Sequence, residues 1–333
     1  MTAPVLLPWH EDGFRQLQSR VSAGRLGHAW LFTGHQGTGK LLLARYLAQY
    51  LLCSSKEGKP CGTCPDCHLF SVDTHPDFRL MQPEKKLITI DQIRDTIEFA
   101  QNMSRRGGMK ILIFEPAEAM NLNAANALLK LLEEPPQQTL LLLVSHQPGL
   151  LLATIRSRCQ VLRCGLPPQD MAIRWLDDSG FSGNASVALQ RAGGAPLRAV
   201  SQVDGALQAE RLQLLTCLQG LAAGKLYPVE AAKKCEKFNI TASIDYQLEC
   251  VADLSACAQR ARSLHDPDLG TLAEQLNLMQ QPGVYSRHLH RLYAELQEAR
   301  RVAMASNNAN PLLLLEAVFG RWLQLGQRSR ISV

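Results

Sequence analysis

The stretch "GHQGTGKL", residues 34–41, stands between an apolar run typical of a strand, "HAWLFTG" (28–34), and a run typical of a helix, "KLLLARYLAQYLL" (40–52). A strand, a glycine-rich loop and a helix in this order form a phosphate-binding loop, in which backbone N–H groups cradle phosphate oxygens. Further short apolar strands alternate with helical stretches as far as residue 165. This alternation predicts a parallel sheet of five strands, with helices covering both faces.

The loop carries only part of the chemistry that ATP requires. Gly34, Gly39 and Lys40 occupy phosphate-binding positions, whereas Leu41 stands where a Ser or Thr hydroxyl binds Mg²⁺. The strand predicted at 110–116, "KILIFEP", ends in Glu-Pro instead of the Asp-Glu pair that holds metal and activates water. Two defects in separate elements predict a degenerate loop that keeps its shape and binds little or no ATP.

A cluster of cysteines predicts a metal site. The chain has 10 cysteines and no recognisable export signal, so we expect a reducing compartment, in which metal binding is favoured over disulfides. Four thiols that are close in sequence and flanked by Gly and Pro suit one tetrahedral Zn²⁺ with no open position. His68 is an alternative ligand, and we expect it to be a bystander. The predicted structural zinc module spans residues 53–68, with ligands Cys53, Cys61, Cys64 and Cys67.

Composition and periodicity bound the rest of the chain. Its 333 residues are 46% hydrophobic and 20% charged, with a formal net charge of +5, as in ordinary soluble proteins of two or three domains. The charge permits contact with nucleic acid without implying it. No apolar run approaches the ~18 residues of a membrane span, so we expect a cytoplasmic protein. We predict an α/β domain at 1–165, a small helical lid domain at 166–206 and an all-α domain at 207–333.

The last predicted helix has a broad apolar face. Leu312, Leu315, Phe319 and Trp322 follow one another at i, i+3, i+7 and i+10. Such a face must be buried. We expect most of it to form the core of the C-terminal domain and any surplus to contact a partner.

Several motifs in order carry a family resemblance. "NALLKLLEEPP" (126–136) followed by "TIRSRC" (154–159), with the four-cysteine insert, "GHAWLFTG" and "THPDF" (74–78), resembles the AAA+ clamp-loader subunits of bacterial DNA polymerase III over about residues 1–205. The resemblance implies an AAA+ module followed by a helical collar. Through the collar, gamma/tau, delta and the other subunits would form a heteropentameric ring within the polymerase holoenzyme.

The resemblance also implies roles for single residues. In the family, "SRC" supplies an arginine finger in trans to the ATP site of an adjacent gamma/tau subunit, which assigns this role to Arg158 on a predicted loop. Active members keep the hydroxyl residue after Lys40 and an Arg that senses the γ-phosphate, where this chain has Leu197 with Arg198 one residue off. The implied function is that of a subunit that does not hydrolyse ATP. It would support ATP-dependent loading of a sliding clamp onto primed DNA.

Two other functions stay open on the residues alone. An active or weakly active AAA+ ATPase would use Glu115 as a metal ligand and would require Lys40. A DNA-binding zinc protein would draw on Arg105 and Arg106, which follow the predicted helix near two glycines and are expected to be simply solvated. Taken without the resemblance, Arg158 is more typical of a solvated surface residue than of a finger.

Overall fold

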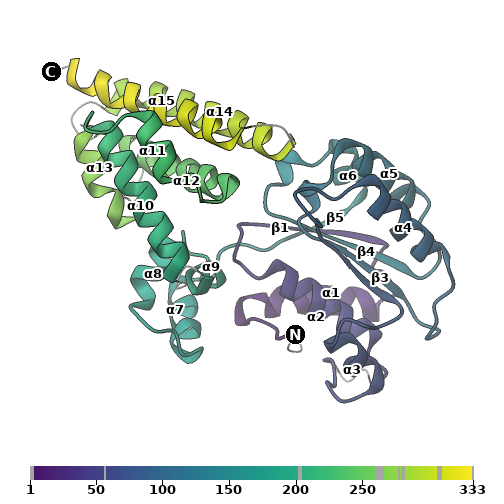
Figure 1. The fold of residues 1–333 in the computed structure, drawn as a ribbon. Helices are drawn as coiled ribbons and strands as arrows, with labels where there is room; N and C mark the ends of the chain where they lie inside the picture. The colour runs from purple at the N-terminus through teal and green to yellow at the C-terminus, as the bar shows by residue number, and fades with distance from the viewer. Residues whose placement is uncertain are drawn as a thin grey trace. The chain divides into compact units, whose positions relative to one another are not determined.

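A computed structural model gives the fold of the chain (Figure 1). Contact clustering separates it into two compact units: 1–181 with 194–198, and 182–193 with 199–333. The division into three domains at 165 and 206 stays a prediction. The structure describes residues 4–55, 58–201, 205–259, 264, 266–276, 278, 282–305 and 310–331.

The first unit contains the predicted parallel sheet. Its five strands lie in the order β2-β3-β4-β1-β5, with every neighbouring pair parallel. All residues of β3 and β4 are buried, which is why these strands appear in the sequence as unbroken apolar runs. The strands are β1 (Ala29–Thr33), β2 (Phe78–Met81), β3 (Lys110–Phe114), β4 (Thr139–Ser145) and β5 (Gln160–Arg163).

Helices cover both faces of the sheet because successive side chains of each strand point to opposite sides. Trp30 and Phe32 pack with Leu43 of α2 on one face, whereas Leu31 packs with Leu128 of α5 on the other. The first face carries α1 (Glu11–Ser22), α2 (Lys40–Leu52) and α3 (Pro65–Ser71). The second face carries α4 (Ile90–Gln101), α5 (Leu122–Glu133) and α6 (Ala153–Arg158).

The ends of α5 follow from local chemistry. The side chain of Asn121 accepts a hydrogen bond from the backbone N–H of Ala124 and so caps the first turn. The helix ends at Glu133, just before Pro135 and Pro136, which cannot continue it. The carboxylate of Glu133 is thereby fixed at the end of a helix whose other face is buried in the core.

The second unit is helical, and no described residue after Arg163 lies in a strand. Phe319 and Trp322 are fully buried in its core, and the indole N–H of Trp322 donates to Gln247 Oε1 over 2.8 Å. The prediction that this face forms core is confirmed. Among the described residues, no helix combines the length and hydropathy needed to cross a bilayer. The later helices are α7 (Gln169–Asp178), α8 (Ala185–Arg191), α9 (Pro196–Ser201), α10 (Gly205–Ala222), α11 (Pro228–Lys234), α12 (Ile240–Ala258), α13 (Gly270–Gln275), α14 (Pro282–Ala305) and α15 (Pro311–Ile331).

Candidate functional site

The predicted phosphate-binding loop joins β1 to α2. Gly37 and Gly39 have φ angles of +82° and +86°, a conformation that strains other residues. A Cβ on Gly34 would lie 2.0 Å from the backbone oxygen of Cys164. The glycines therefore maintain the loop's shape whether or not it binds a nucleotide.

The lysine of the loop is bound to the loop itself. Lys40 Nζ donates to the backbone oxygens of Gly34 and His35 over 2.7 Å and 2.6 Å. Only 2% of Lys40 is exposed, and this burial lowers the pKa of its ammonium to about 8. The cation that would reach phosphates in an active loop here holds together the carbonyl groups of its own loop.

Neighbouring segments close over the rest of the loop. The oxygen of Thr38 accepts hydrogen bonds from His10 Nε2 at 2.7 Å and from Trp9 Nε1 at 2.8 Å. The backbone N–H of Leu197 donates to the oxygen of Gly37 over 3.1 Å. Leu197, predicted where active relatives carry a phosphate-sensing Arg, thus contributes a backbone contact to the closed loop.

Leu41 and Glu115 also have partners within the protein. Leu41 packs against the core beneath α2. Glu115 Oε2 accepts a hydrogen bond from Gln82 Nε2 at 2.7 Å, and Oε1 pairs with His146 Nε2 at 3.3 Å. The contact with His146, more than any other, holds the pKa of Glu115 below its usual value. The carboxylate that could hold a metal is occupied by an amide and an imidazole.

Reasoning from the sequence missed three polar residues of this region: Gln82, Glu118 and His146. Glu118 Oε1 accepts hydrogen bonds from the backbone N–H groups of His146 and Gln147 at 2.8 Å and 3.0 Å. Each missed residue follows the carboxyl end of β2, β3 or β4. Because the carboxyl ends of parallel strands meet at one edge, that placement was a usable signal.

The four predicted metal ligands converge. Their sulfur atoms all lie within 4.8 Å of one another, and the pairs Cys53–Cys61, Cys53–Cys64 and Cys61–Cys67 are 3.5, 3.8 and 3.9 Å apart. Tetrahedral Zn²⁺ with Zn–S bonds of about 2.3 Å would place its sulfurs about 3.8 Å apart. All four are free thiols, so the geometry fits a metal.

The surroundings of the sulfurs favour thiolates only in part. Hydrogen bonds from the backbone N–H groups of Thr63 and Cys64 lower the pKa of Cys61 to about 6. Burial instead raises the pKa of Cys53 and Cys67. Two of the four therefore need a cation to become thiolates, and a divalent metal supplies one.

The cysteine module is tied to the rest of the unit through Asp66, which lies between two of the ligands. The hydroxyl of Ser54 donates to Asp66 Oδ2, and Arg106 Nε donates to Oδ1 over 2.7 Å. His75 Nε2 lies 3.6 Å from the same Oδ1. The hydrogen bond from Ser54 is the largest influence holding the pKa of this carboxyl low. A buried carboxylate thus links α3 to two distant segments.

A second buried carboxylate, Asp77, holds the turn that contains Arg106. It accepts hydrogen bonds from Ser104 Oγ and from the backbone N–H groups of Arg105 and Arg106, all between 2.8 and 2.9 Å. The expectation of a simply solvated side chain is therefore wrong for Arg106, whereas the side chain of Arg105 is exposed. The guanidinium of Arg106 pairs with Asp66, and the backbone of both residues is fixed by Asp77.

Arg158 is the last residue of the short helix α6. The prediction that it lies on a loop is therefore wrong. Its NH1 group donates to the backbone oxygen of Thr154 over 3.0 Å, and its NH2 group pairs with Glu133 Oε1 at 2.6 Å. The side chain is 36% exposed. Its contacts are with α5 and α6, and none is with the loop that holds Lys40.

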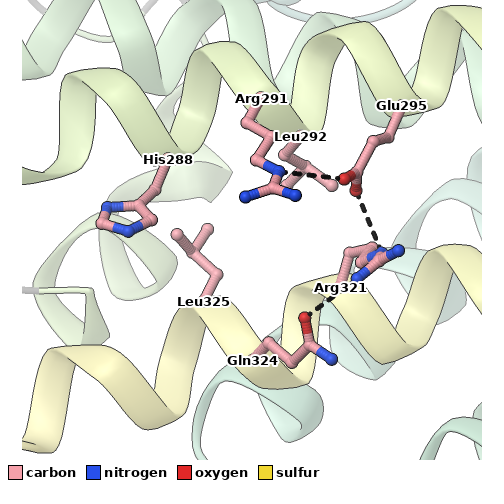
Figure 2. A pocket seen from close by; sticks show the side chains of 7 residues that line it. All are labelled: His288, Arg291, Leu292, Glu295, Arg321, Gln324 and Leu325. Carbon is pink, nitrogen blue, oxygen red and sulfur yellow. Dashed lines mark hydrogen bonds and ion pairs between the residues drawn. The ribbon is translucent and has the colours of Figure 1, made fainter.

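The second unit has a small polar pocket of about 100 Å³ between α14 and α15 (Figure 2). Arg291 and Arg321 both point toward Glu295, with N–O distances of 3.3 and 3.0 Å. Arg321 also donates to Gln324. One carboxylate shared by two guanidinium groups makes this a surface ion-pair network, and the geometry selects no ligand.

Comparison of the sequence with known proteins finds relatives along almost the whole chain. Residues 9–167 match the family model described as "DNA polymerase III, delta subunit". A DNA polymerase III subunit delta' of Pseudomonas aeruginosa is 34% identical over 330 residues, covering 96% of this chain and 98% of the relative. The Escherichia coli subunit of that name is 37% identical over 203 residues, covering 60% of this chain and 61% of the relative. A gamma subunit-related protein of Thermotoga maritima superposes with a TM-score of 0.44 at 20% identity, covering 93% and 99% of the two chains.

In the sheet, β1 lies between β4 and β5, and the glycine-rich loop follows β1. This strand order and loop position define an AAA+ module, which a helical region follows. Within that class, similarity along almost the whole length of both chains decides the family. The chain belongs to the DNA polymerase III delta' subunits.

Proposed function

We propose that this chain is a clamp-loader subunit that does not hydrolyse ATP and that donates Arg158 to the ATP site of an adjacent gamma/tau subunit. It takes its place with gamma/tau and delta in a heteropentameric ring. The ring loads a sliding clamp onto primed DNA in the cytoplasm. The C-terminal helices serve as its collar in that ring.

The observation that carries the proposal is the self-contained bonding of the phosphate loop. Lys40 is bound to the carbonyl groups of its own loop, and Glu115 is bound to Gln82 and His146. Leu41 offers no ligand for Mg²⁺. ATP would have to displace several hydrogen bonds and would still lack its metal, so the chain serves its neighbour's site.

The exposure and chemistry of Arg158 support its role as a finger. A guanidinium has more N–H donors than its two contacts with Glu133 and Thr154 use. The remaining donors suit an oxyanion, and a fixed Arg stabilises the charge that develops on a transferring phosphoryl group.

We further propose that Cys53, Cys61, Cys64 and Cys67 hold a structural Zn²⁺. The observations in favour are the sulfur separations and the two buried thiols that need a cation. With four protein ligands the ion has no open position, so it would organise the segment between α2 and α3 and take no part in catalysis.

The experiment is ATP hydrolysis by rings reconstituted with Arg158→Ala. We expect single-turnover hydrolysis at the neighbouring site to fall by on the order of 10³-fold, with a smaller fall in steady state because other sites stay intact. Arg156→Ala is the matched control, since Arg156 is an exposed arginine of the same helix. Equal rates in rings containing either variant would overturn the finger role.

An active or weakly active AAA+ ATPase remains the alternative, in which Glu115 exchanges His146 for a metal ion. The isolated chain would then turn over MgATP, and Lys40→Ala would abolish that turnover. We expect no turnover that depends on Lys40. A Lys40-dependent rate would require that the loop open and that another oxygen replace the missing hydroxyl ligand.

A further inference from the structure

The ion pair between Arg158 and Glu133 connects two helices that are each anchored in the core. Glu133 is the last residue of α5, and its predecessors Leu131 and Leu132 are 3% and 2% exposed. Ile155, one turn before Arg158 in α6, is completely buried. Because both backbones are fixed by packing, formation of the pair of 2.6 Å orders only the two side chains.

The pair adds little to the stability of the fold. The side chain of Glu133 is 49% exposed and that of Arg158 is 36% exposed, and water screens the attraction between charges that are this exposed. The pair has a larger effect on the position of the guanidinium than on the stability of the fold, because Arg has a long side chain with many rotamers. The contact with Glu133 on one side and with the oxygen of Thr154 on the other favours one orientation of the guanidinium.

We infer that Glu133 is a positioning residue for Arg158. This inference rests on the proposed function of Arg158 as a finger. Glu133 accepts one N–H group of the guanidinium and leaves other N–H groups directed to a phosphate oxyanion of the neighbouring subunit. The hydrogen bond to Oε1 orients the finger, and the negative charge of the carboxylate is secondary. Glu133→Gln, which keeps an acceptor oxygen, should therefore preserve the orientation, whereas Glu133→Ala should not.

The test is a double-mutant cycle in the reconstituted ring, read as single-turnover ATP hydrolysis. We expect Glu133→Ala to lower the rate constant by about five- to tenfold without weakening ATP binding, a size typical of the coupling between two residues in contact. Glu133→Gln should keep most of the rate. In a ring that already contains Arg158→Ala, Glu133→Ala should have no further effect.

Glu134→Ala is the matched control, because Glu134 is also an exposed carboxylate, is next in sequence and has no ion pair among the described residues. Ring assembly is checked by sizing each complex. If Arg158→Ala slows hydrolysis but Glu133→Ala does not, the positioning role is overturned and the finger stands. If the effects of Glu133→Ala and Arg158→Ala multiply independently, Glu133 acts elsewhere. If Arg158→Ala has no effect, the proposed function itself fails.

Discussion

The two ends of α2 present two opposite kinds of site. At its first residue, Lys40, the phosphate-binding loop keeps its backbone shape while Lys40 is bonded to carbonyl groups of the loop itself and Gly37 to the backbone of Leu197. One residue beyond its last, Cys53 joins Cys61, Cys64 and Cys67. Burial raises the pKa of Cys53 and Cys67, and among the described residues no cation is recorded as lowering it. A ligand site is therefore better recognised by buried donor atoms that have no protein partner for their charge than by a match to a sequence motif.

Of the changes that test this comparison, removal of one cysteine sulfur should have the largest effect on the free energy of unfolding. We expect one Zn²⁺ per wild-type chain and none in Cys64→Ser, with the free energy of unfolding of the first unit lower by on the order of 5 kcal/mol, because the metal's binding energy contributes to folding. Metal analysis and chemical unfolding measure both quantities. His68→Ala, which changes an exposed neighbour of Cys67, should retain the ion. Full stability of Cys64→Ser, or a wild-type chain that folds without metal, would remove the contrast between the two ends.

Glycine substitutions compare how tightly the backbone is packed in the segments at the two ends of α2. A Cβ at Gly34 would lie 2.0 Å from the oxygen of Cys164, whereas Gly62 in the cysteine module has φ +74° and open space around it. We expect Gly34→Ala to lower the free energy of unfolding by about 3 kcal/mol, through displaced backbone. Gly62→Ala should cost only about 1–2 kcal/mol, for the left-handed conformation. Urea unfolding of both variants decides the point, and equal costs would mean that the nucleotide loop is no more tightly built than an exposed turn.

Most of the fold could be predicted from the sequence because it depends on local periodicity. The alternation of apolar strands and helices, the end of α5 at two prolines and the burial of Phe319 and Trp322 all follow from residues that are close in sequence. The convergence of the four cysteines was predictable for the same reason, since three of them lie within seven residues.

The rest depends on contacts between distant residues. Arg106 meets Asp66 across 40 positions, and Arg158 meets Glu133 across 25. A pattern of charges gives no partner at such separations, so Arg106 appeared solvated and the pair of Arg158 with Glu133 was not predicted. The sequence contained His75 and Asp77 within a motif used only for the family resemblance, and their role in holding a turn appeared only in the structure.

A substitution of Asp66 tests whether the cysteine module stabilises the turn at 104–106 as well as its own loop. Asp66→Asn leaves only one acceptor oxygen for Ser54 and Arg106, and we expect the free energy of unfolding to fall by about 2 kcal/mol, as for other buried charged hydrogen bonds. Bound metal should stay at one ion per chain. Backbone hydrogen exchange at 104–106 should rise, because Arg106 loses its anchor.

The control for that variant is Asp91→Asn, which removes the charge of a carboxylate that is 81% exposed and that pairs with Arg94 in the part of the chain that the structure describes. We expect a change within about 0.5 kcal/mol and no change in exchange at the turn. If Asp66→Asn loses its metal, Asp66 supports the cysteine ligands and the turn is a secondary consequence. If exchange at the turn stays unchanged, Asp77 alone suffices to hold it.

The smallest effect is the pH dependence that Lys40 contributes. Burial lowers its pKa to about 8 from an ordinary value near 10.4, so between these values the unfolded chain binds more protons than the folded chain. The free energy of unfolding therefore rises with pH across this window. From pH 7 to pH 9 we expect wild type to gain on the order of 1 kcal/mol relative to Lys40→Met, measured by urea unfolding at constant ionic strength.

The same measurement with MgATP discriminates between a closed loop and a working one. Phosphates bound beside Lys40 would stabilise its ammonium, raise its pKa toward the ordinary value and flatten the pH dependence. We expect MgATP to leave the wild-type slope unchanged, because the ammonium is already held by Gly34 and His35 and Leu41 supplies no metal ligand. A slope that flattens with MgATP, and only while Lys40 is present, would mean that the two ends of α2 are alike and that each awaits a ligand.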